Sequence, residues 1–217
     1  MTKFSHSYSS LKMYENCPYR YYRQKVVKDV QDVQGEAAAY GEAIHKALEL
    51  RLRDKTPLPD HLAKFESVCH MIEQKPGVLE LEREMTLTES LTPTTWFAKD
   101  AWLRSKLDVL VVDGDKATIL DWKTGKRRPD PEQLDIFAVQ VFQHFPEVTV
   151  ANTALVWLKD MAVDKYSRRR EDAPEIWERV LSKVARIKAS DETGKWVVRP
   201  SGLCPWCPLH GKCPATK

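Results

Sequence analysis

The sequence lacks the marks of an exported, membrane-spanning or disulfide-built protein. Its first ten residues contain no apolar stretch of about 7 to 15 residues, which a signal peptide needs. No window approaches the roughly 18 apolar residues of a membrane span. Five cysteines are an odd number for a disulfide framework. These absences predict a cytoplasmic protein of a bacterial, archaeal or phage-infected cell, with no membrane partner.

The composition shows little excess charge and no repetition. The 34 Lys and Arg against 31 Asp and Glu leave a net charge of +3, too little to indicate nucleic-acid binding by itself. No repeat of about 20 to 50 residues is present, which excludes a solenoid. The chain has 217 residues, 42% of them hydrophobic and 30% charged. That is enough for one globular domain, slightly more polar than average.

Hydrophobic periodicity predicts both helices and strands. Between residues 36 and 53, apolar positions recur every three or four residues, as on one face of a helix. Between residues 79 and 87 they mostly alternate with acidic residues, as in a half-buried strand. We therefore expect an α/β fold. The same reasoning predicts helices over 62–72, 132–145 and 173–189, strands over 96–98, 103–112, 117–122 and 148–158, and a turn over 113–115.

Two acids and a lysine interrupt strands that are otherwise built from Val, Ile and Leu. Asp121 and Lys123 are two residues apart, so their side chains leave the same face of a strand. Hairpin pairing can bring Asp108 alongside them. Carboxylates suit Mg²⁺ or Mn²⁺, which can polarise a phosphodiester and activate a bound water. In the alternative interpretation, Asp121 and Lys123 merely end a strand, because such triplets also occur by accident.

An ordered series of motifs extends this pattern along the chain. The series consists of Gly41-x-x-x-His45, an acidic strand at Glu84, Asp108, Asp121-x-Lys123-Thr124-Gly125, and Gln133-Leu134-x-x-Phe137. The series resembles the PD-(D/E)XK nuclease superfamily. Within it, the chain is similar to the RecB-like branch, which includes the CRISPR-associated exonucleases and the AddB nuclease domain. The resemblance implies one nuclease domain over residues 1–217, with a restriction-endonuclease-like core: a mixed central sheet flanked by helices.

The resemblance also implies roles for individual residues. The metal ligands would be His45, Asp108 and Asp121, with the Trp122 carbonyl as an additional ligand. The less fixed acidic position matches Glu84, although Glu82 or Glu80 on the same strand face could be its counterpart. Lys123 would be catalytic, and Gln133 would lie near the metal or the scissile strand. The implied catalytic set is thus Asp108, Asp121, Lys123 and Gln133.

The chain departs from the family pattern at two positions. Ser105 stands where a glycine is expected three residues before the first aspartate, and Phe137 stands where a tyrosine is usual. Without the tyrosine hydroxyl, a contact with the DNA backbone is in doubt. Neither departure touches the implied metal ligands.

Four cysteines have the spacing of a metal site. Cys204, Cys207 and Cys213 form C-x2-C-x5-C, and Cys17 stands near the N-terminus. Four thiolates can hold a [4Fe–4S] cluster or zinc, and His210 also permits a local zinc site without Cys17. The one-plus-three arrangement resembles that of RecB-like iron–sulfur nucleases.

That likeness implies a [4Fe–4S] cluster that acts as a clasp between about 14–25 and 200–217. Trp206 would shield the cluster. Cys69 lies on the apolar stripe of its predicted helix, so we expect it to be a core residue.

Two basic stretches are candidates for contact with DNA. Near the N-terminus, tyrosines alternate with arginines and a lysine between residues 14 and 25, a composition that suits base stacking and phosphate neutralisation. Alternatively, a helix packs these tyrosines inward. The second stretch follows Lys123 directly. The candidate DNA-binding residues are Arg20, Tyr21, Arg23, Lys126, Arg127 and Arg128. A further basic run, Lys165 with residues 168–170, is expected to be a solvated face.

The sequence thus predicts a metal-dependent DNA exonuclease that acts at single-stranded or duplex ends. The expected processes are recombination, repair, phage DNA metabolism or CRISPR spacer processing. No helicase motif is present, so unwinding would need a helicase, and a recombinase or a CRISPR integration protein are the other expected partners. The alternative is a non-catalytic, zinc-containing DNA-binding or adaptor protein.

Overall fold

The computed structural model describes residues 5–32 and 35–216, which form two compact units. One unit is Gly35–Trp177, and the other combines Met1–Gln34 with Glu178–Lys217. The prediction of one nuclease domain over 1–217 stays a prediction, and residues 1–4, 33–34 and 217 of that span lie outside the described residues. The two units are described separately below.

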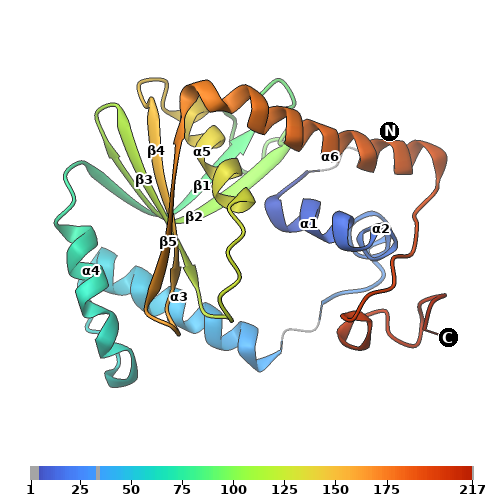
Figure 1. Ribbon diagram of the computed structural model, residues 1–217, viewed down its shortest axis with the longest axis horizontal. Coiled ribbons are helices and arrows are strands. Elements are labelled where there is room, and N and C mark those ends of the chain that lie inside the picture. The colour runs from blue at the N-terminus through green and yellow to red at the C-terminus, as the bar shows by residue number, and fades with distance from the viewer. Residues whose placement is uncertain (1–4, 33–34, 217) are drawn as a thin grey trace. The chain divides into compact units, whose positions relative to one another are not determined.

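The unit Gly35–Trp177 is built on a five-stranded mixed sheet, as predicted (Figure 1). The strands are ordered β1-β2-β3-β4-β5, and every neighbouring pair is antiparallel except β3 and β4. The parallel pair needs a crossover, which α5 (Glu132–His144) supplies. The strands are β1 (Val78–Leu87), β2 (Leu103–Asp113), β3 (Lys116–Lys123), β4 (Val150–Trp157) and β5 (Ala162–Arg169).

Helices α3 (Glu36–Asp54) and α4 (Glu66–Glu73) lie to one side of this sheet (Figure 1). A 3₁₀ helix, η2 (Asp60–Phe65), precedes α4. The apolar stripe predicted for 36–53 is buried from Gly41 to Leu52, whereas Ala37 at its start is exposed. The buried part anchors α3 and leaves the rest of the helix surface to polar residues. The core between these helices and the strands includes Ile44, Leu48, Leu52, Leu62, Phe65, Cys69, Val109, Val111, Trp122 and Val156.

Helix α5 is buried on nearly all sides. Every residue from Leu134 to Phe142 is buried, as expected of a helix that lies in a core rather than on its surface. Its one buried carboxylate, Asp135, accepts a hydrogen bond from Arg168 Nε at 2.7 Å. Phe137, at the position where a tyrosine is usual, is 3% exposed.

One predicted strand is wrong, and one strand was not predicted. Residues 96–98 lie in a turn, because the loop between β1 and β2 bonds internally: the Thr94 N–H donates to Thr86 O, and the Ala98 N–H to Thr95 O. Strand β5 was missed because its alternation runs between exposed and half-buried side chains rather than between polar and apolar ones. Edge strands often carry such charged sequences.

Arg170, directly after strand β5, stabilises the chain around the end of α5. Arg170 donates to the carbonyls of Phe142, Phe145, Pro146 and Val148. Phe142 belongs to the last turn of α5 and Phe145 caps that helix, so Arg170 bonds to carbonyls that the helix end leaves without helical partners and to the chain that follows. The run 168–170 is therefore not simply a solvated face.

The other unit consists of short helices and irregular chain. Ser7 and Ser10 form a capping box at the start of α1 (Tyr8–Asn16), which satisfies backbone donors of the first turn. Tyr14 Oη donates to Arg186 O at 2.8 Å and so ties α1 to α6 (Ala173–Thr193). The remaining elements are α2 (Pro18–Tyr21), the π-helical segment η1 (Tyr22–Val27) and the 3₁₀ turn η4 (Cys204–Trp206).

The tyrosines of α1 and α2 form an aromatic cluster with Trp196. Tyr21 and Tyr22 stack on Trp196 with ring centroids 6.0 and 5.2 Å away. Tyr21 is 1% exposed, and burial raises the pKa of its hydroxyl to about 12. A buried ring has no free face for a base, which weighs against contact between Tyr21 and DNA, and the assignment of Tyr21 to DNA binding stays an untested prediction. Here the alternative of inward-packed tyrosines holds.

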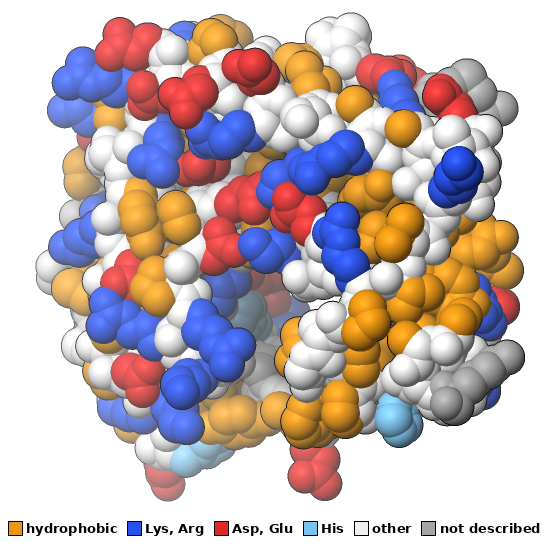
Figure 2. All heavy atoms as spheres, turned by 45° about the vertical axis from the view of Figure 1, so that its right-hand side comes forward, with side chains coloured by type: hydrophobic (Ala, Val, Ile, Leu, Met, Phe, Trp, Pro, Cys, Tyr) orange, Lys and Arg blue, Asp and Glu red, His pale blue; other side chains and the backbone are white. Residues whose placement is uncertain are grey.

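The surface agrees with the small net charge. On the face in Figure 2, acidic and basic side chains are interspersed, most clearly over its upper part. Among the described residues, no helix combines the length and apolarity that crossing a membrane requires.

Candidate active site and cysteine cavity

The sheet is irregular at Asp108 on both sides of β2. Toward β1, Leu81 pairs with Val109 and Arg83 with Leu107, but Glu82 between them has a φ of 53°. A left-handed φ is uncommon for residues other than glycine and concentrates at functional sites. Toward β3, the last pair is Val109 with Leu120. Asp108 therefore lies where the β2–β3 ladder ends and where the β1–β2 ladder is interrupted for one residue pair.

The Asp108 carboxylate takes the place of a backbone partner for β3 and also contacts helix α3. Its Oδ2 accepts the Trp122 N–H at 2.7 Å, and its Oδ1 lies 3.3 Å from Nδ1 of His45 on α3. The Trp122 side chain is 3% exposed and packs into the core beneath α3. Asp108 thus joins β3 to α3 through its two oxygens.

Asp121, Lys123 and Gln133 form a closed triangle of polar contacts. Lys123 Nζ donates to Gln133 Oε1 at 2.7 Å, and Gln133 Nε2 donates to Asp121 Oδ1 at 2.8 Å. Lys123 Nζ lies 2.6 Å from Asp121 Oδ2. Asp121 and Lys123 come from β3, whereas Gln133 comes from the first turn of α5. One amide therefore orients both charged groups.

The electrostatics link this triangle to the His45–Asp108 pair. Asp121 is 4% exposed. Burial raises its pKa to about 6, with a further rise from the Asp108 charge, although Lys123 and His45 act in the opposite direction. Burial alone would lower the pKa of His45, but the hydrogen bond and charge of Asp108 raise it above the usual value. The four side chains share one electrostatic environment.

Gly41 allows the end of β3 to approach α3. A Cβ at Gly41 would lie 2.8 Å from Oγ1 of Thr124, the residue after Lys123. Gly41 and His45 are four residues apart, so they lie on the same face of α3. The spacing Gly41-x-x-x-His45 thus places the close approach directly beside the histidine.

The donor atoms fit a divalent cation in chemistry but bond to protein partners. Asp121 Oδ2 is buried and has the Lys123 ammonium 2.6 Å away. Histidine nitrogen and carboxylate oxygen are suitable ligands for Mn²⁺ or Mg²⁺. His45 and Asp108 contact each other as they stand. Over residues 5–32 and 35–216, no three His, Cys, Asp or Glu side chains are arranged so that they could hold a metal ion.

Comparison with known proteins decides the family. The sequence model of the PD-(D/E)XK nuclease superfamily matches residues 5–214. The chain belongs to this superfamily. Among solved structures, a provisionally named exonuclease from Eubacterium rectale has a TM-score of 0.57 at 17% identity over 94% of this chain and 87% of that one. SSO0001 has a TM-score of 0.52 at 14% identity over 100% and 89%. At these identities the likeness shows the fold alone, and no curated protein matches the sequence.

Among the acidic residues of β1, Glu82 and Glu84 lie in different surroundings, and the assignment of either one to the metal site stays a prediction. Glu84 is exposed and pairs with Lys106 in the strand register. Glu82 lines a cavity of about 840 Å³ together with His45, Gly41 and Lys106. The positive φ of Glu82 breaks the alternation of the strand, so the shared face of the acidic residues that the sequence suggested does not persist.

The four cysteines of the predicted cluster site line one cavity. It has a volume of about 60 Å³ and includes Cys17, Cys204, Cys207 and Cys213, with His210 beside them. Backbone N–H groups donate to two of the sulfurs: Arg199 to Cys17 at 3.5 Å and Ser201 to Cys204 at 3.2 Å. Such hydrogen bonds are typical of sulfur in metal sites.

Trp206 does not shield this cavity. Its side chain is 79% exposed, which corrects the prediction made from its place between Cys204 and Cys207. Cys69, by contrast, is buried in the core of the other unit, and burial raises its thiol pKa to about 11.

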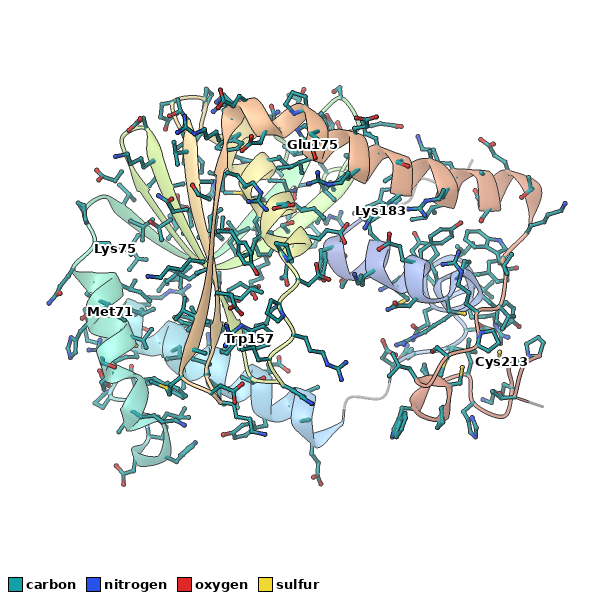
Figure 3. All side chains as sticks on the ribbon, viewed as in Figure 1. Met71, Lys75, Trp157, Glu175, Lys183 and Cys213 are labelled. Carbon is teal, nitrogen blue, oxygen red and sulfur yellow. The ribbon has the colours of Figure 1, made fainter. Side chains whose placement is uncertain are left out.

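Most of the predicted DNA-binding arginines have acidic partners. Arg20 bonds to Asp32 at 2.7 Å and Arg23 to Asp29 at 2.7 Å. Arg127 pairs with Asp164, which also accepts the indole N–H of Trp157 at 2.7 Å. Figure 3 labels Trp157 at the end of β4.

Asp164 thus holds the loop that follows Lys123. On that loop, Lys126 and Arg128 are exposed. The assignment of both residues to DNA binding stays a prediction.

Proposed function

We propose that the chain is a Mg²⁺- or Mn²⁺-dependent DNA exonuclease of the RecB-like branch that hydrolyses phosphodiester bonds at single-stranded ends. The observation that carries this proposal is the Asp121–Lys123–Gln133 triangle beside His45 and Asp108. A buried carboxylate next to a lysine is costly for a purely structural role. A superfamily whose members are nucleases supplies the reaction class.

Each side chain has a role in this proposal. His45, Asp108, Asp121 and the Trp122 carbonyl would hold the cation, with Glu82 rather than Glu84 as the acidic residue of β1. When bound, the cation lowers the pKa of a water and polarises the phosphate. Lys123 directs its ammonium toward the same place and offsets developing negative charge. Gln133 accepts from Lys123 and donates to Asp121, which keeps both in place.

The cysteine cavity is proposed to hold a [4Fe–4S] cluster. Support comes from the placement of all four predicted thiols around one cavity and from the two N–H donors to sulfur. The cluster would join Cys17 to the C-terminal segment, so its binding free energy would add to the stability of that unit. Zinc bound by three of these cysteines and His210 is the competing occupant.

The biological setting follows from the same chemistry. A cytoplasmic exonuclease of this kind would act in recombination, repair, phage DNA metabolism or CRISPR spacer processing. It would receive strands opened by a helicase and pass its products to a recombinase or an integration complex.

One assay tests the activity. Anaerobically purified protein is incubated with oligonucleotides and duplexes labelled at the 5′ or the 3′ end, with Mg²⁺, Mn²⁺ or EDTA. We expect metal-dependent release of short products from single-stranded ends. A fixed internal cut would indicate an endonuclease, and binding without cleavage in any metal would favour the adaptor alternative. Absorbance near roughly 400 nm separates iron–sulfur from zinc.

A further inference from the structure

Helix α3 borders two cavities of opposite character. The first, about 840 Å³, is lined by Gly41 and His45. The second, about 340 Å³, is lined by Tyr40 and Ile44. The two pairs of residues are one position apart, so they face directions that differ by about 100° around the helix. Thr124 lines both cavities.

The cations of the first cavity are neutralised by neighbouring acids. Lys46 Nζ lies 2.9 Å from Glu49 and Lys106 Nζ lies 2.5 Å from Glu82. Glu42 also lines this cavity. A site of this charge suits a cation more than a phosphate.

The second cavity has basic groups and no acid. His61, Lys64 and Lys159 line it, and none of its lining residues is Asp or Glu. Within the described part of the chain, these three side chains form no ion pair. The Lys64 ammonium lies 5.0 Å from the ring centroid of Phe65, which also lines the cavity. The cavity therefore favours an anionic ligand.

Aromatic side chains accompany these cations. Tyr40 is 56% exposed on α3 although its ring is large and apolar. Exposed rings beside unpaired lysines are the combination with which proteins bind single-stranded nucleic acid: the ring stacks on a base and the cations contact phosphate. A volume of about 340 Å³ is at the small end of ligand sites, which suits one nucleotide rather than a duplex.

Two residues that line the second cavity are direct sequence neighbours of candidate active-site residues. Ile44 immediately precedes His45, and Thr124 immediately follows Lys123. We propose that the cavity lined by Tyr40, His61, Lys64, Phe65, Thr124 and Lys159 binds one nucleotide of the DNA strand, next to the phosphate that is cut. The base stacks on Tyr40, and the adjoining phosphate lies between Lys64 and Lys159. This subsite rests on the proposed nuclease function.

Binding of a labelled single-stranded oligonucleotide in EDTA, followed by fluorescence anisotropy, tests the cationic part. The double variant Lys64→Gln/Lys159→Gln is compared with Lys75→Gln/Lys116→Gln, which removes two exposed lysines outside both cavities; Figure 3 labels Lys75. Each lost phosphate contact should reduce the slope of log affinity against log salt by about 0.7. Because Lys64 and Lys159 contact the same phosphate, we expect a reduction of about 0.7 for the cavity variant and none for the control.

Tyr40 tests the stacking part. Loss of one stacked base weakens binding by roughly 5- to 150-fold, so Tyr40→Leu should weaken binding by that factor, whereas Tyr40→Phe keeps the ring and the affinity. In the cleavage assay, Tyr40→Leu should raise KM and leave kcat unchanged, because the subsite binds the strand without touching the reacting atoms.

The outcomes separate the two proposals. If wild-type protein binds but does not cleave DNA in any metal, the nuclease function fails. If wild-type protein cleaves but the cavity variants match their controls in salt slope and KM, the subsite alone is wrong. An equal loss of slope in both double variants would also overturn the subsite, since it would show only general attraction to lysines.

Discussion

The two candidate metal sites differ in what positions their ligands. His45, Asp108 and Asp121 belong to α3, β2 and β3, and Gln133 to α5. The cysteines belong to irregular chain: Cys17 lies between α1 and α2, and the others lie at or after the one-turn helix η4. Figure 3 labels Cys213 in this C-terminal segment. The first site is built on long helices and sheet strands, and the second on turns and the ends of short helices.

Burial follows the same division. Asp121 is 4% exposed and its neighbours on the sheet, Leu120 and Trp122, pack into the core. Around the cysteines, Leu203 and Trp206 are 61% and 79% exposed. Leu209 is buried beside the cysteines, but apolar burial is the main source of folding free energy, so the cysteine segment receives less of it than the sheet does. The site formed by His45, Asp108 and Asp121, here called the oxygen site, should therefore keep its structure without metal. The cysteine site should depend on a bound metal for its structure.

The largest expected effect is on catalysis at the oxygen site. Asp121→Ala and Lys123→Ala should each reduce the rate of DNA cleavage on the order of 10³-fold or more, because each removes a charge from the reaction centre. The fold and the absorbance of the cluster should be unchanged. The matched control is Lys116→Ala at the other, exposed end of β3. Undiminished turnover of Lys123→Ala would show that the triangle is structural.

The next largest effect should be on folding at the cysteine site. Cys204→Ser should lose the absorbance near roughly 400 nm together with solubility, since the binding free energy of a structural metal is folding free energy of several kcal/mol. Cys69→Ala removes a thiol from the other core and should keep the colour, at a cost of about 1 kcal/mol or somewhat more. A colourless, soluble and fully active Cys204→Ser protein would contradict the dependence on metal.

The same division explains how far the sequence could predict the structure. Apolar periodicity places β1, β2, β3, α3 and α5 to within a few residues, because burial of one face decides those elements. It also brings Asp121 and Lys123 to one strand end. Strand β5 was missed because its sequence carries charges that find partners only in the folded chain, such as Asp164 with Arg127.

The candidate sites differ from expectation for a related reason. Tyr21 and Trp206 are both aromatic residues near cysteines, yet one is 1% and the other 79% exposed. Packing of Tyr14 and Trp196 against Tyr21 decides the first case. Glu82 and Glu84 are equivalent in a regular strand, and the left-handed backbone at Glu82 that separates them leaves no mark in the sequence.

A smaller effect is expected from the close approach of β3 to α3. Gly41→Ala would place a Cβ 2.8 Å from Thr124 Oγ1, so the strand end that carries Lys123 must shift, and we expect cleavage to fall about tenfold. Thermal stability should hold, since alanine favours a helix over glycine by up to about 1 kcal/mol.

Two further variants test that explanation. Thr124→Ala in the Gly41→Ala background removes the clashing oxygen and should restore cleavage. Gly35→Ala, whose Cβ would meet nothing within 4 Å, should be neutral. If Thr124→Ala does not restore the rate, the close approach does not position Lys123.

The smallest expected effect is on the stability of the unit Gly35–Trp177, and it does not involve a bound metal. Glu73 accepts hydrogen bonds from Lys55 at 2.6 Å and Arg51 at 2.7 Å. These bonds lower its pKa from 4.5 to about 2. A lowered pKa stabilises the fold above the unfolded value, and this contribution is lost as the pH falls from 4.5 to about 2.

Thermal melts of wild type and Glu73→Gln between pH 7 and pH 2 measure this contribution. The variant should be less stable at pH 7 by on the order of 1 kcal/mol, since solvent screens this partly exposed group, and the difference should vanish toward pH 2. Glu171→Gln, whose side chain is 75% exposed, should show no such difference. A gap between wild type and Glu73→Gln that persists at pH 2 would mean that packing, rather than charge, accounts for the loss.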